Sequence, residues 1–223
     1  MIHACVVFYN DGPEMLQKSL MALKENGLNI IAVDGAFREF IEHERDLPAY
    51  SDDGCVDVAR KYAHTYVPAP EGGWPYQQTK RNAYVSLIPD GEYFFVIDSD
   101  EILHPFRLGP DSLVEDSYKL MENRHNERGP VQRMNCTRVF KKYPDLVYLY
   151  QHCRIYRGNQ HQPHDLETGL VSRASLNNIR APFLLDAEGE RIWFDHRCDL
   201  RPLDRKRQKQ NYYRMREERK MVY

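Results

Sequence analysis

Short runs of apolar and β-branched residues recur along the first half of the chain, separated by segments with helical or polar patterns. An uninterrupted apolar run is typical of a strand that is covered on both faces, as in a parallel sheet between layers of helices. The strands predicted in this way lie at residues 4–9, 30–33, 65–67 and 93–97.

Helical patterns fill the intervals between these strands. Leucines recur at helical spacing from Leu16 to Leu23, and Pro13 and Gly27 suit the first turn and the C-terminal stop of such a helix. Two further helices are predicted at residues 56–62 and 76–87. This alternation predicts an α/β fold with a mostly parallel, Rossmann-like sheet flanked by helices.

The connections between these elements decide where a ligand is expected. Right-handed crossovers place the C-terminal ends of parallel strands along one edge of the sheet, where open α/β sheets bind their ligands. The loop after the first strand, the turn at Asp34 and the segment from Asp98 to Asp100 all follow strand ends. We therefore expect them to converge, beside a polar and irregular loop at residues 36–54.

The second half of the chain carries a weaker pattern. Its aromatic and β-branched segments predict a small antiparallel region, with strands at residues 131–140, 146–156, 183–185 and 192–194, the last two joined by a turn at 187–190. Gly109-Pro110 and Gly129-Pro130 bracket an expected surface helix, and Pro202 suits the start of a charged final helix that runs to about Lys220. No shift in composition marks a boundary, so residues 1–223 are expected to form one domain.

Composition narrows the class of protein. Hydrophobic residues make up 42% and charged residues 29% of the chain, and the formal net charge of -2 favours no general attraction to nucleic acid. No apolar stretch approaches the roughly 18 residues that span a bilayer, and the first apolar run is too short for a signal peptide. The five cysteines form no CxxC pair. We expect a cytoplasmic protein without an integral membrane segment.

The sharpest chemical feature is Asp98-Ser99-Asp100, which follows the clearest predicted strand. Alternate residues of an extended chain point the same way, so the two carboxylates share a face and Ser99 does not. Two oxygen ligands at that spacing suit Mg²⁺ or Mn²⁺, and such a metal offsets the charge on a departing nucleoside diphosphate. The alternative is a solvated acidic turn.

Other polar residues near the predicted sheet edge have two interpretations each. Asp34 either caps the turn at Gly35 or accepts hydrogen bonds from a base or ribose. Lys80-Arg81-Asn82 alone is more typical of a solvated helix face, although Arg81 suits a diphosphate clamp. His196 either completes a metal site with two carboxylates or is a structural histidine.

The order of these motifs resembles family 2 and related glycosyltransferases with the GT-A fold. Asp34 is followed by Gly-Ala-Phe where that family usually has Asp-Gly-Ser, and His164-Asp165 stands where His-Glu is more familiar. The segments that carry the resemblance are Val6–Asn10, Asn29–Gly35, Lys80–Ala83, Gly91–Asp100, Arg154–Arg157 with His164-Asp165, and His196.

The resemblance implies glycosyl transfer from a nucleotide-sugar, most often a UDP-sugar, to a hydroxyl acceptor on a glycan, protein, lipid or modified DNA base. It makes residues 1–104 the nucleotide-sugar-binding half and residues 105–223 the acceptor-binding half. Asp165 would be the general base of an inverting reaction. The remaining residues it implies are Tyr9, Asp34, Arg81, Asp98 and Ser99 for the nucleotide, and Asp98, Asp100 and His196 for the Mn²⁺ or Mg²⁺.

Rival functions and partners remain open at this level. A sugar-phosphate nucleotidyltransferase shares the sheet and the metal, but the loop Asn10–Glu14 is acidic and holds one glycine. A non-catalytic nucleotide- or glycan-binding module is the second rival. The basic segment Arg205-Lys206-Arg207 suits DNA or an anionic membrane, or else a solvated helix that closes over the active site. The sugar, the oligomeric state and the stereochemical outcome are not defined by sequence.

Overall fold

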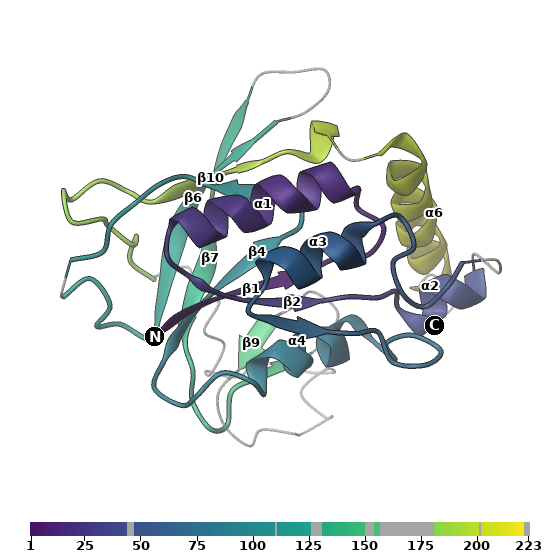
Figure 1. Cartoon of the computed structure of the whole chain (residues 1–223), viewed down its shortest axis with the longest axis horizontal. Coiled ribbons are helices and arrows are strands. Elements are labelled where there is room, and N and C mark those ends of the chain that lie inside the picture. Colours follow the sequence, from purple (N-terminus) through teal and green to yellow (C-terminus); the bar gives the residue numbers. More distant parts are fainter. Residues whose placement is uncertain are drawn as a thin grey trace.

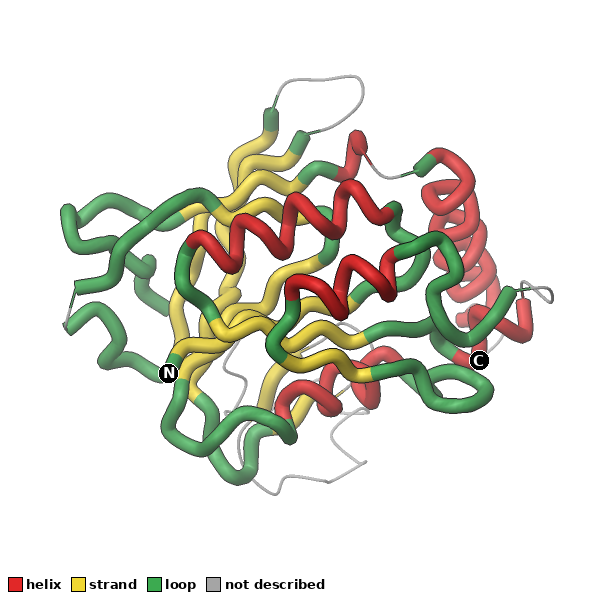
Figure 2. Tube along the Cα trace, in the orientation of Figure 1, coloured by secondary structure: helices red, strands yellow, loops and turns green. Residues whose placement is uncertain are grey.

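A curled, mixed sheet forms the centre of the protein. The structure is a computed structural model that describes residues 1–43, 47–109, 111–125, 131–149, 154–156, 181–200 and 202–220. In these ranges the main sheet has eight strands in the order β3-β2-β1-β4-β7-β6-β10-β5, and a separate pair is formed by β8 and β9. Figure 2 shows this sheet running between helices on both faces.

The elements follow the chain order shown in Figure 1. The strands are β1 (Ile2–Val7), β2 (Asn29–Val33), β3 (Thr65–Val67), β4 (Tyr93–Asp98), β5 (Glu101–Leu103), β6 (Ser117–Arg124), β7 (Gln132–Lys141), β8 (Val147–Leu149), β9 (Arg154–Tyr156) and β10 (Trp193–His196). The helices are α1 (Pro13–Glu25), α2 (Arg38–His43), α3 (Cys55–Tyr62), α4 (Gln77–Val85), the 3-10 turn η1 (Cys198–Leu200) and α6 (Leu203–Lys220).

The half of the sheet made by β3, β2, β1 and β4 is parallel throughout. Val7 at the end of β1 is in register with Val33 of β2 and with Asp98 of β4. The C-terminal ends of these strands therefore lie at one edge, as the sequence predicted. The other half is mixed, because β7 runs antiparallel to both β4 and β6, and β10 runs parallel to β6.

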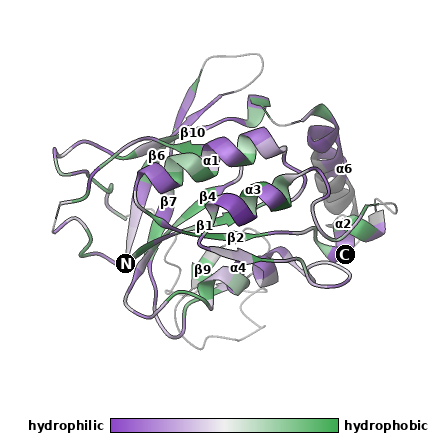
Figure 3. Ribbon diagram, viewed as in Figure 1, coloured by the Kyte–Doolittle hydropathy of each residue, from purple (hydrophilic) through white to green (hydrophobic). Residues whose placement is uncertain are grey.

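Each face of the sheet has its own hydrophobic cluster. Alternation along β1 divides them: Ala4 and Val6 point to the face covered by α1 and α3, and Cys5 points to the opposite face. Burial of a leucine side chain stabilises a fold by about 1.5–3 kcal/mol, so α1 is held mainly by packing. In Figure 3 the central strands are largely hydrophobic, whereas the described part of α6 is largely hydrophilic. The helix side chains in these clusters are Leu16, Leu20, Leu23, Cys55 and Ala59 on one face, and Tyr84 and Val85 on the other.

Three local predictions are wrong. The segment between Gly109-Pro110 and Gly129-Pro130 contains β6 and no helix in its described part. The strand pairs with β7 on one side and β10 on the other, and its alternate side chains are buried. The polar segment 36–54 contains the short helix α2. Within 146–156, β8 and β9 form an antiparallel pair in place of one strand.

The last helix is confirmed, since α6 begins at Leu203 and reaches Lys220. Its start packs on the loop between β1 and α1, where Pro202 lies 3.2 Å from the position that a Cβ on Gly12 would take. In Figure 1, α6 and α2 lie beyond the C-terminal ends of β1 and β2. None of the helices in the described ranges combines the length and apolarity that crossing a membrane requires.

Candidate functional site

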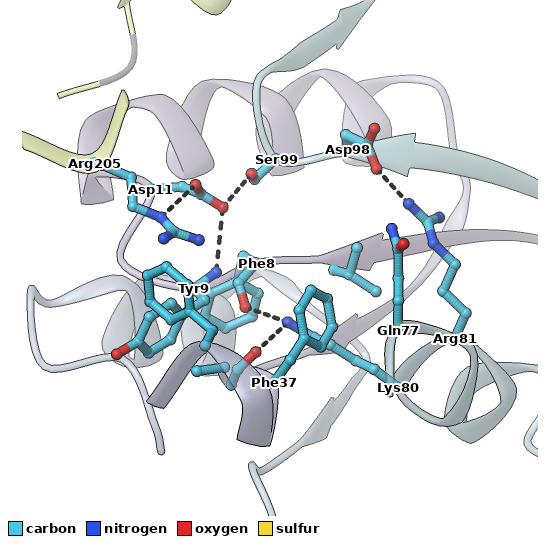
Figure 4. Close-up of a pocket in the computed structure, with 14 residues that line it drawn as sticks. Phe8, Tyr9, Asp11, Phe37, Gln77, Lys80, Arg81, Asp98, Ser99 and Arg205 are labelled. Carbon is cyan, nitrogen blue, oxygen red and sulfur yellow. Dashed lines mark hydrogen bonds and ion pairs between the residues drawn. The ribbon is translucent and has the colours of Figure 1, made fainter. Parts of the chain in front are cut away.

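A cavity of about 150 Å³ opens at the C-terminal ends of β1, β2 and β4, which is where the strand order predicted a ligand site. Figure 4 shows its labelled side chains converging from β4, α4, α6 and the loops that follow β1 and β2. Its aromatic walls are Phe8, Tyr9, Phe37 and Phe40. Its charged lining residues are Asp11, Lys80, Arg81, Asp98 and Arg205.

One end of the cavity, formed by Tyr9, Phe37, Phe40, Lys80 and Arg205, is aromatic and cationic; we call it the aromatic end. The rings of Tyr9 and Phe40 meet edge to face with centroids 5.9 Å apart. The Arg205 guanidinium lies 5.0 Å from the Tyr9 ring centroid and 5.1 Å from that of Phe40. The guanidinium therefore lies within cation–π distance of both rings, which are nearly perpendicular to each other.

Tyr9 is fixed in this wall at both ends of its side chain. Its hydroxyl donates to the Pro48 carbonyl at 2.8 Å, and its backbone N–H donates to Asp11 Oδ2 at 3.2 Å. Burial raises the pKa of Tyr9 to about 12, against the opposing charge of Arg205. The ring is consequently a neutral, immobilised surface for stacking.

Lys80 is the most deeply buried cation of the cavity. Its Nζ donates to the carbonyl oxygens of Phe8 and Gly35, each at 2.6 Å, and lies 5.9 Å from the Phe37 ring centroid. Burial lowers the pKa of Lys80 to about 7, although the negative charges of Asp34 and Asp11 oppose that shift. The expected solvated helix face is therefore wrong for Lys80 and Arg81, which are both buried.

Asp11 connects the loop after β1 to the segment after β4. Its Oδ2 accepts a hydrogen bond from Ser99 Oγ at 2.6 Å, and Arg205 Nε lies 3.5 Å from its Oδ1. Ser99, which the resemblance placed at the nucleotide, lines the cavity. The bond to Asp11 fixes the direction in which the chain leaves β4.

Asp34 lies behind the cavity wall and does not line it. Its carboxylate is fully buried and accepts hydrogen bonds from the Ser51 backbone N–H at 3.1 Å, from Ser51 Oγ at 2.6 Å and from the Tyr66 hydroxyl at 3.4 Å. The Asp34 carbonyl accepts from Trp74 Nε1 at 2.6 Å. Asp34 therefore holds the loop around Ser51 in place, and base recognition by its carboxylate remains a prediction.

Beyond Asp98, which lines the cavity, lies a group of charged residues from β4, the turn after it, β5, β6 and β10. Asp98, Asp100, Glu101, Glu122 and His196 are called the carboxylate end below. Asp98 Oδ1 accepts a hydrogen bond from Arg81 Nη2 at 3.0 Å, and Arg138 Nη1 lies 3.9 Å from its Oδ2. Arg138 also forms a close ion pair with the fully buried Glu101. Glu101 Oε2 in turn accepts the Asp98 backbone N–H at 2.8 Å.

The expectation of an extended chain through Asp98 and Asp100 is wrong, because Ser99 and Asp100 form a turn between β4 and β5. The two carboxylates therefore have different partners. Asp100 Oδ2 lies 3.3 Å from His196 Nε2, and His196 Nδ1 lies 2.9 Å from Glu122 Oε1. Burial opposes protonation of His196, but the hydrogen bonds to Asp100 and Glu122 outweigh it and raise its pKa to about 10.

A metal ion has only part of its ligand set here. In the part of the chain that the structure describes, no three His, Cys, Asp or Glu side chains are grouped to hold one. Asp100 nevertheless places a carboxylate oxygen beside His196 Nε2, which becomes a nitrogen donor when a metal displaces its proton, and Glu122 contacts the other ring nitrogen, as carboxylates do behind metal-binding histidines. The pair fits a cation that takes its remaining ligands from phosphate oxygens and water, as Mg²⁺ often does.

The structure thus brings four of the predicted residues, Tyr9, Arg81, Asp98 and Ser99, to one cavity, and places Asp100 beside His196. Asp165 lies outside the described residues. The sequence interpretation missed Lys80 and the rings of Phe37 and Phe40. A signal existed for Lys80, because it precedes the buried Tyr84 by one helical turn and so shares its face.

Comparison with known proteins does not assign the chain to a family. No protein-family model matches the chain, and no curated protein matches its sequence. A functional proposal therefore depends on the geometry of the cavity and on the motifs that surround it.

Proposed function

We propose that this chain is a glycosyltransferase with a GT-A fold that transfers a sugar from a nucleoside-diphosphate sugar to a hydroxyl acceptor. The observation that carries the proposal is a single cavity at the parallel strand ends, with aromatic rings and cations at one end and the Asp98 carboxylate leading to the Asp100–His196 pair at the other. The nucleoside-diphosphate part of a nucleotide-sugar has the same order, with a planar base at one end and a diphosphate at the other.

The aromatic end supports the nucleoside part of the proposal. Stacking of a base on an aromatic side chain contributes about 1–3 kcal/mol, and the Tyr9–Phe40 pair already holds the planar Arg205 guanidinium. Lys80 and Arg81 add donors for base, ribose or phosphate oxygens. Tyr9 and Arg81 are therefore proposed to position the nucleotide.

The carboxylate end supports the diphosphate part. Asp100 and His196 would hold Mn²⁺ or Mg²⁺, with Glu122 orienting the imidazole. When bound, such an ion stabilises the negative charge that develops on a leaving diphosphate. Arg81 holds Asp98 by a hydrogen bond at 3.0 Å, so Asp98 is proposed to face the ribose and the phosphates as an oriented acceptor.

Acceptor activation is assigned to Asp165, as the resemblance implies for an inverting enzyme. A carboxylate in that role removes the proton of the acceptor hydroxyl as the new glycosidic bond forms. The acceptor itself is proposed only as a hydroxyl compound: a glycan, protein, lipid or modified DNA base. A non-catalytic nucleotide-binding module is the alternative, and it would keep the aromatic end without needing Asp100.

A screen of nucleotide-sugar hydrolysis with Mn²⁺ tests the proposal. Wild type is compared with Asp100→Asn, which keeps the shape of the side chain but removes its charge. Asp57→Asn on the exposed surface of α3 is the matched control. We expect wild type and the control to hydrolyse at least one nucleotide-sugar, and Asp100→Asn to lose about a hundredfold or more in rate, the scale of one lost transition-state contact. An unchanged rate of hydrolysis in Asp100→Asn would show that Asp100 does not hold the metal.

A further inference from the structure

Lys80 has an unusual electrostatic position. It is buried, and the acceptors of its Nζ are two main-chain carbonyls, those of Phe8 and Gly35. Among the described residues no carboxylate lies within ion-pair distance of this ammonium. A buried cation without a close anion costs several kcal/mol unless all of its hydrogen-bond donors are satisfied.

A second buried lysine provides the contrast. Lys142 also donates to a main-chain carbonyl, that of Tyr143 at 2.7 Å, but it has an anionic partner in Asp90 at 3.0 Å. An ammonium has three N–H donors, and the described residues accept two of those of Lys80. Because Lys80 lines the cavity, a ligand is the natural source of the third acceptor.

The surroundings of Lys80 define that acceptor. In Figure 4 its ammonium lies beside Phe37 and the Phe8 carbonyl, away from Asp98, which Arg81 contacts. A nucleotide bound with its diphosphate toward Asp98 would place the far edge of its base at Lys80. The acceptor is therefore a substituent on the base ring, opposite the glycosidic bond.

The cavity is large enough for one six-membered ring and is open to solvent, so the rest of a nucleotide can extend out of it. Its volume of about 150 Å³ matches that of a protein cavity that holds benzene, a single six-membered ring. Uracil and cytosine are single rings of that size, and they differ at the atom opposite the glycosidic bond. Uracil has a carbonyl oxygen there, which accepts a hydrogen bond, whereas cytosine has an amino group, which donates one.

Building on the proposed function, we infer that Lys80 is a specificity-determining residue that donates to this carbonyl and selects uracil-type nucleotides over cytosine. A hydrogen bond to a charged donor contributes about 1.5–3 kcal/mol, so the preference for UDP over CDP is about tenfold or more. Lys80→Met removes the ammonium donor and keeps an unbranched side chain of similar length.

Calorimetric titrations with Mn²⁺ test the inference on the full chain. UDP, CDP and inorganic pyrophosphate are each titrated into wild type, Lys80→Met and the control Lys142→Met. We expect wild type and Lys142→Met to prefer UDP by about tenfold or more, and Lys80→Met to lose about tenfold in UDP affinity while its CDP and pyrophosphate affinities change by less than about twofold.

Three results would overturn the inference. Lys80→Met could fold and keep the wild-type preference, it could lose pyrophosphate affinity as much as UDP affinity, or wild type could bind UDP and CDP equally. The last result needs no variant, so the inference stays testable if Lys80→Met does not fold. A wild-type protein that binds no nucleoside diphosphate would overturn the proposed function itself, which is a different outcome from binding without preference.

Discussion

The aromatic end and the carboxylate end of the cavity are stabilised in different ways. At the aromatic end, Tyr9, Phe37 and Phe40 supply neutral surfaces, and Lys80 and Arg205 meet them without a carboxylate closer than 3.5 Å in the described residues. At the carboxylate end, nearly every charge has a close counter-charge, as in the Glu101–Arg138 and Glu122–His196 pairs.

This difference matches two tasks that binding of the proposed nucleotide-sugar would require. Rings and an unbalanced cation discriminate among planar ligands, because their contacts depend on shape and on one hydrogen bond. A network of paired charges holds carboxylates in place against their mutual repulsion. Substitutions at the carboxylate end should therefore change stability and metal affinity, whereas substitutions at the aromatic end should change the binding of the base.

The largest effect is expected for Arg138→Met at the carboxylate end. The substitution leaves Glu101 buried beside Asp98 without its cation, and breaking a buried ion pair in this way costs about 3–5 kcal/mol of unfolding free energy. Urea denaturation measures the loss. Arg133→Met, at an exposed position on the same strand, should change stability by less than about 0.5 kcal/mol. Equal stabilities of the two variants would contradict the ion-pair account.

Glu122→Gln should weaken Mn²⁺ binding and leave binding of the nucleotide base unchanged. Glu122 contacts His196 Nδ1 at 2.9 Å, and loss of such an orienting carboxylate lowers metal affinity by about 10–100-fold. Mn²⁺ titration in the presence of UDP measures this change, with Glu188→Gln in an exposed turn as the control. If Glu122→Gln weakened metal-free binding of uridine as much as it weakened Mn²⁺ binding, the two ends would not be separable.

Lys80 predicts a pH dependence at the aromatic end. Its folded pKa of about 7 lies below the value of a free lysine, so the unfolded chain binds this proton more tightly. Stability of the wild type relative to Lys80→Met should therefore rise as pH increases from about 7 to about 10.4. UDP affinity of wild type should fall as pH rises through about 7, because folded Lys80 loses its proton there and the neutral amine is a weaker donor. Parallel stability curves for the two proteins would argue against a buried, shifted Lys80.

The smallest effect concerns the docking of α6. Arg205→Ala removes the cation–π contacts with Tyr9 and Phe40 and the contact with Asp11, and a cation–π contact of this kind contributes about 0.5–2 kcal/mol. Hydrogen exchange in the first turns of α6 should increase accordingly. Arg207→Ala, whose side chain is 76% exposed, is the control. Identical exchange in both variants would mean that Arg205 does not hold the helix.

Sequence patterns predicted the parallel half of the fold because its strands are uninterrupted apolar runs between amphipathic helices. They failed at β6, where Lys119 and Glu122 interrupt the apolar positions and the neighbours β7 and β10 come from later in the chain. Period-two burial at Tyr118 and Leu120 was the available signal.

The candidate site was predicted to a similar extent. Asp98 lies at the end of β4, as the strand pattern predicted, but the turn at Ser99 that separates it from Asp100 is held by the hydrogen bond to Asp11, far away in the sequence. Phe37 and Phe40 belong to a segment too polar to suggest a wall of the cavity. For Arg205 the sequence offered a helix that closes over the site as one alternative, and the packing of α6 on the loop at Gly12 is the tertiary contact that places it there.

The melting temperature with nucleoside diphosphates, measured with and without Mn²⁺, tests the central claim most directly. A ligand that binds the native state raises its stability, by about 2.7 kcal/mol at a concentration of one hundred times its Kd. UDP with Mn²⁺ should raise the melting temperature of wild type more than either alone, and Asp100→Asn should lose the part that depends on Mn²⁺. No shift with any nucleoside diphosphate, with or without metal, would contradict nucleotide binding at this cavity.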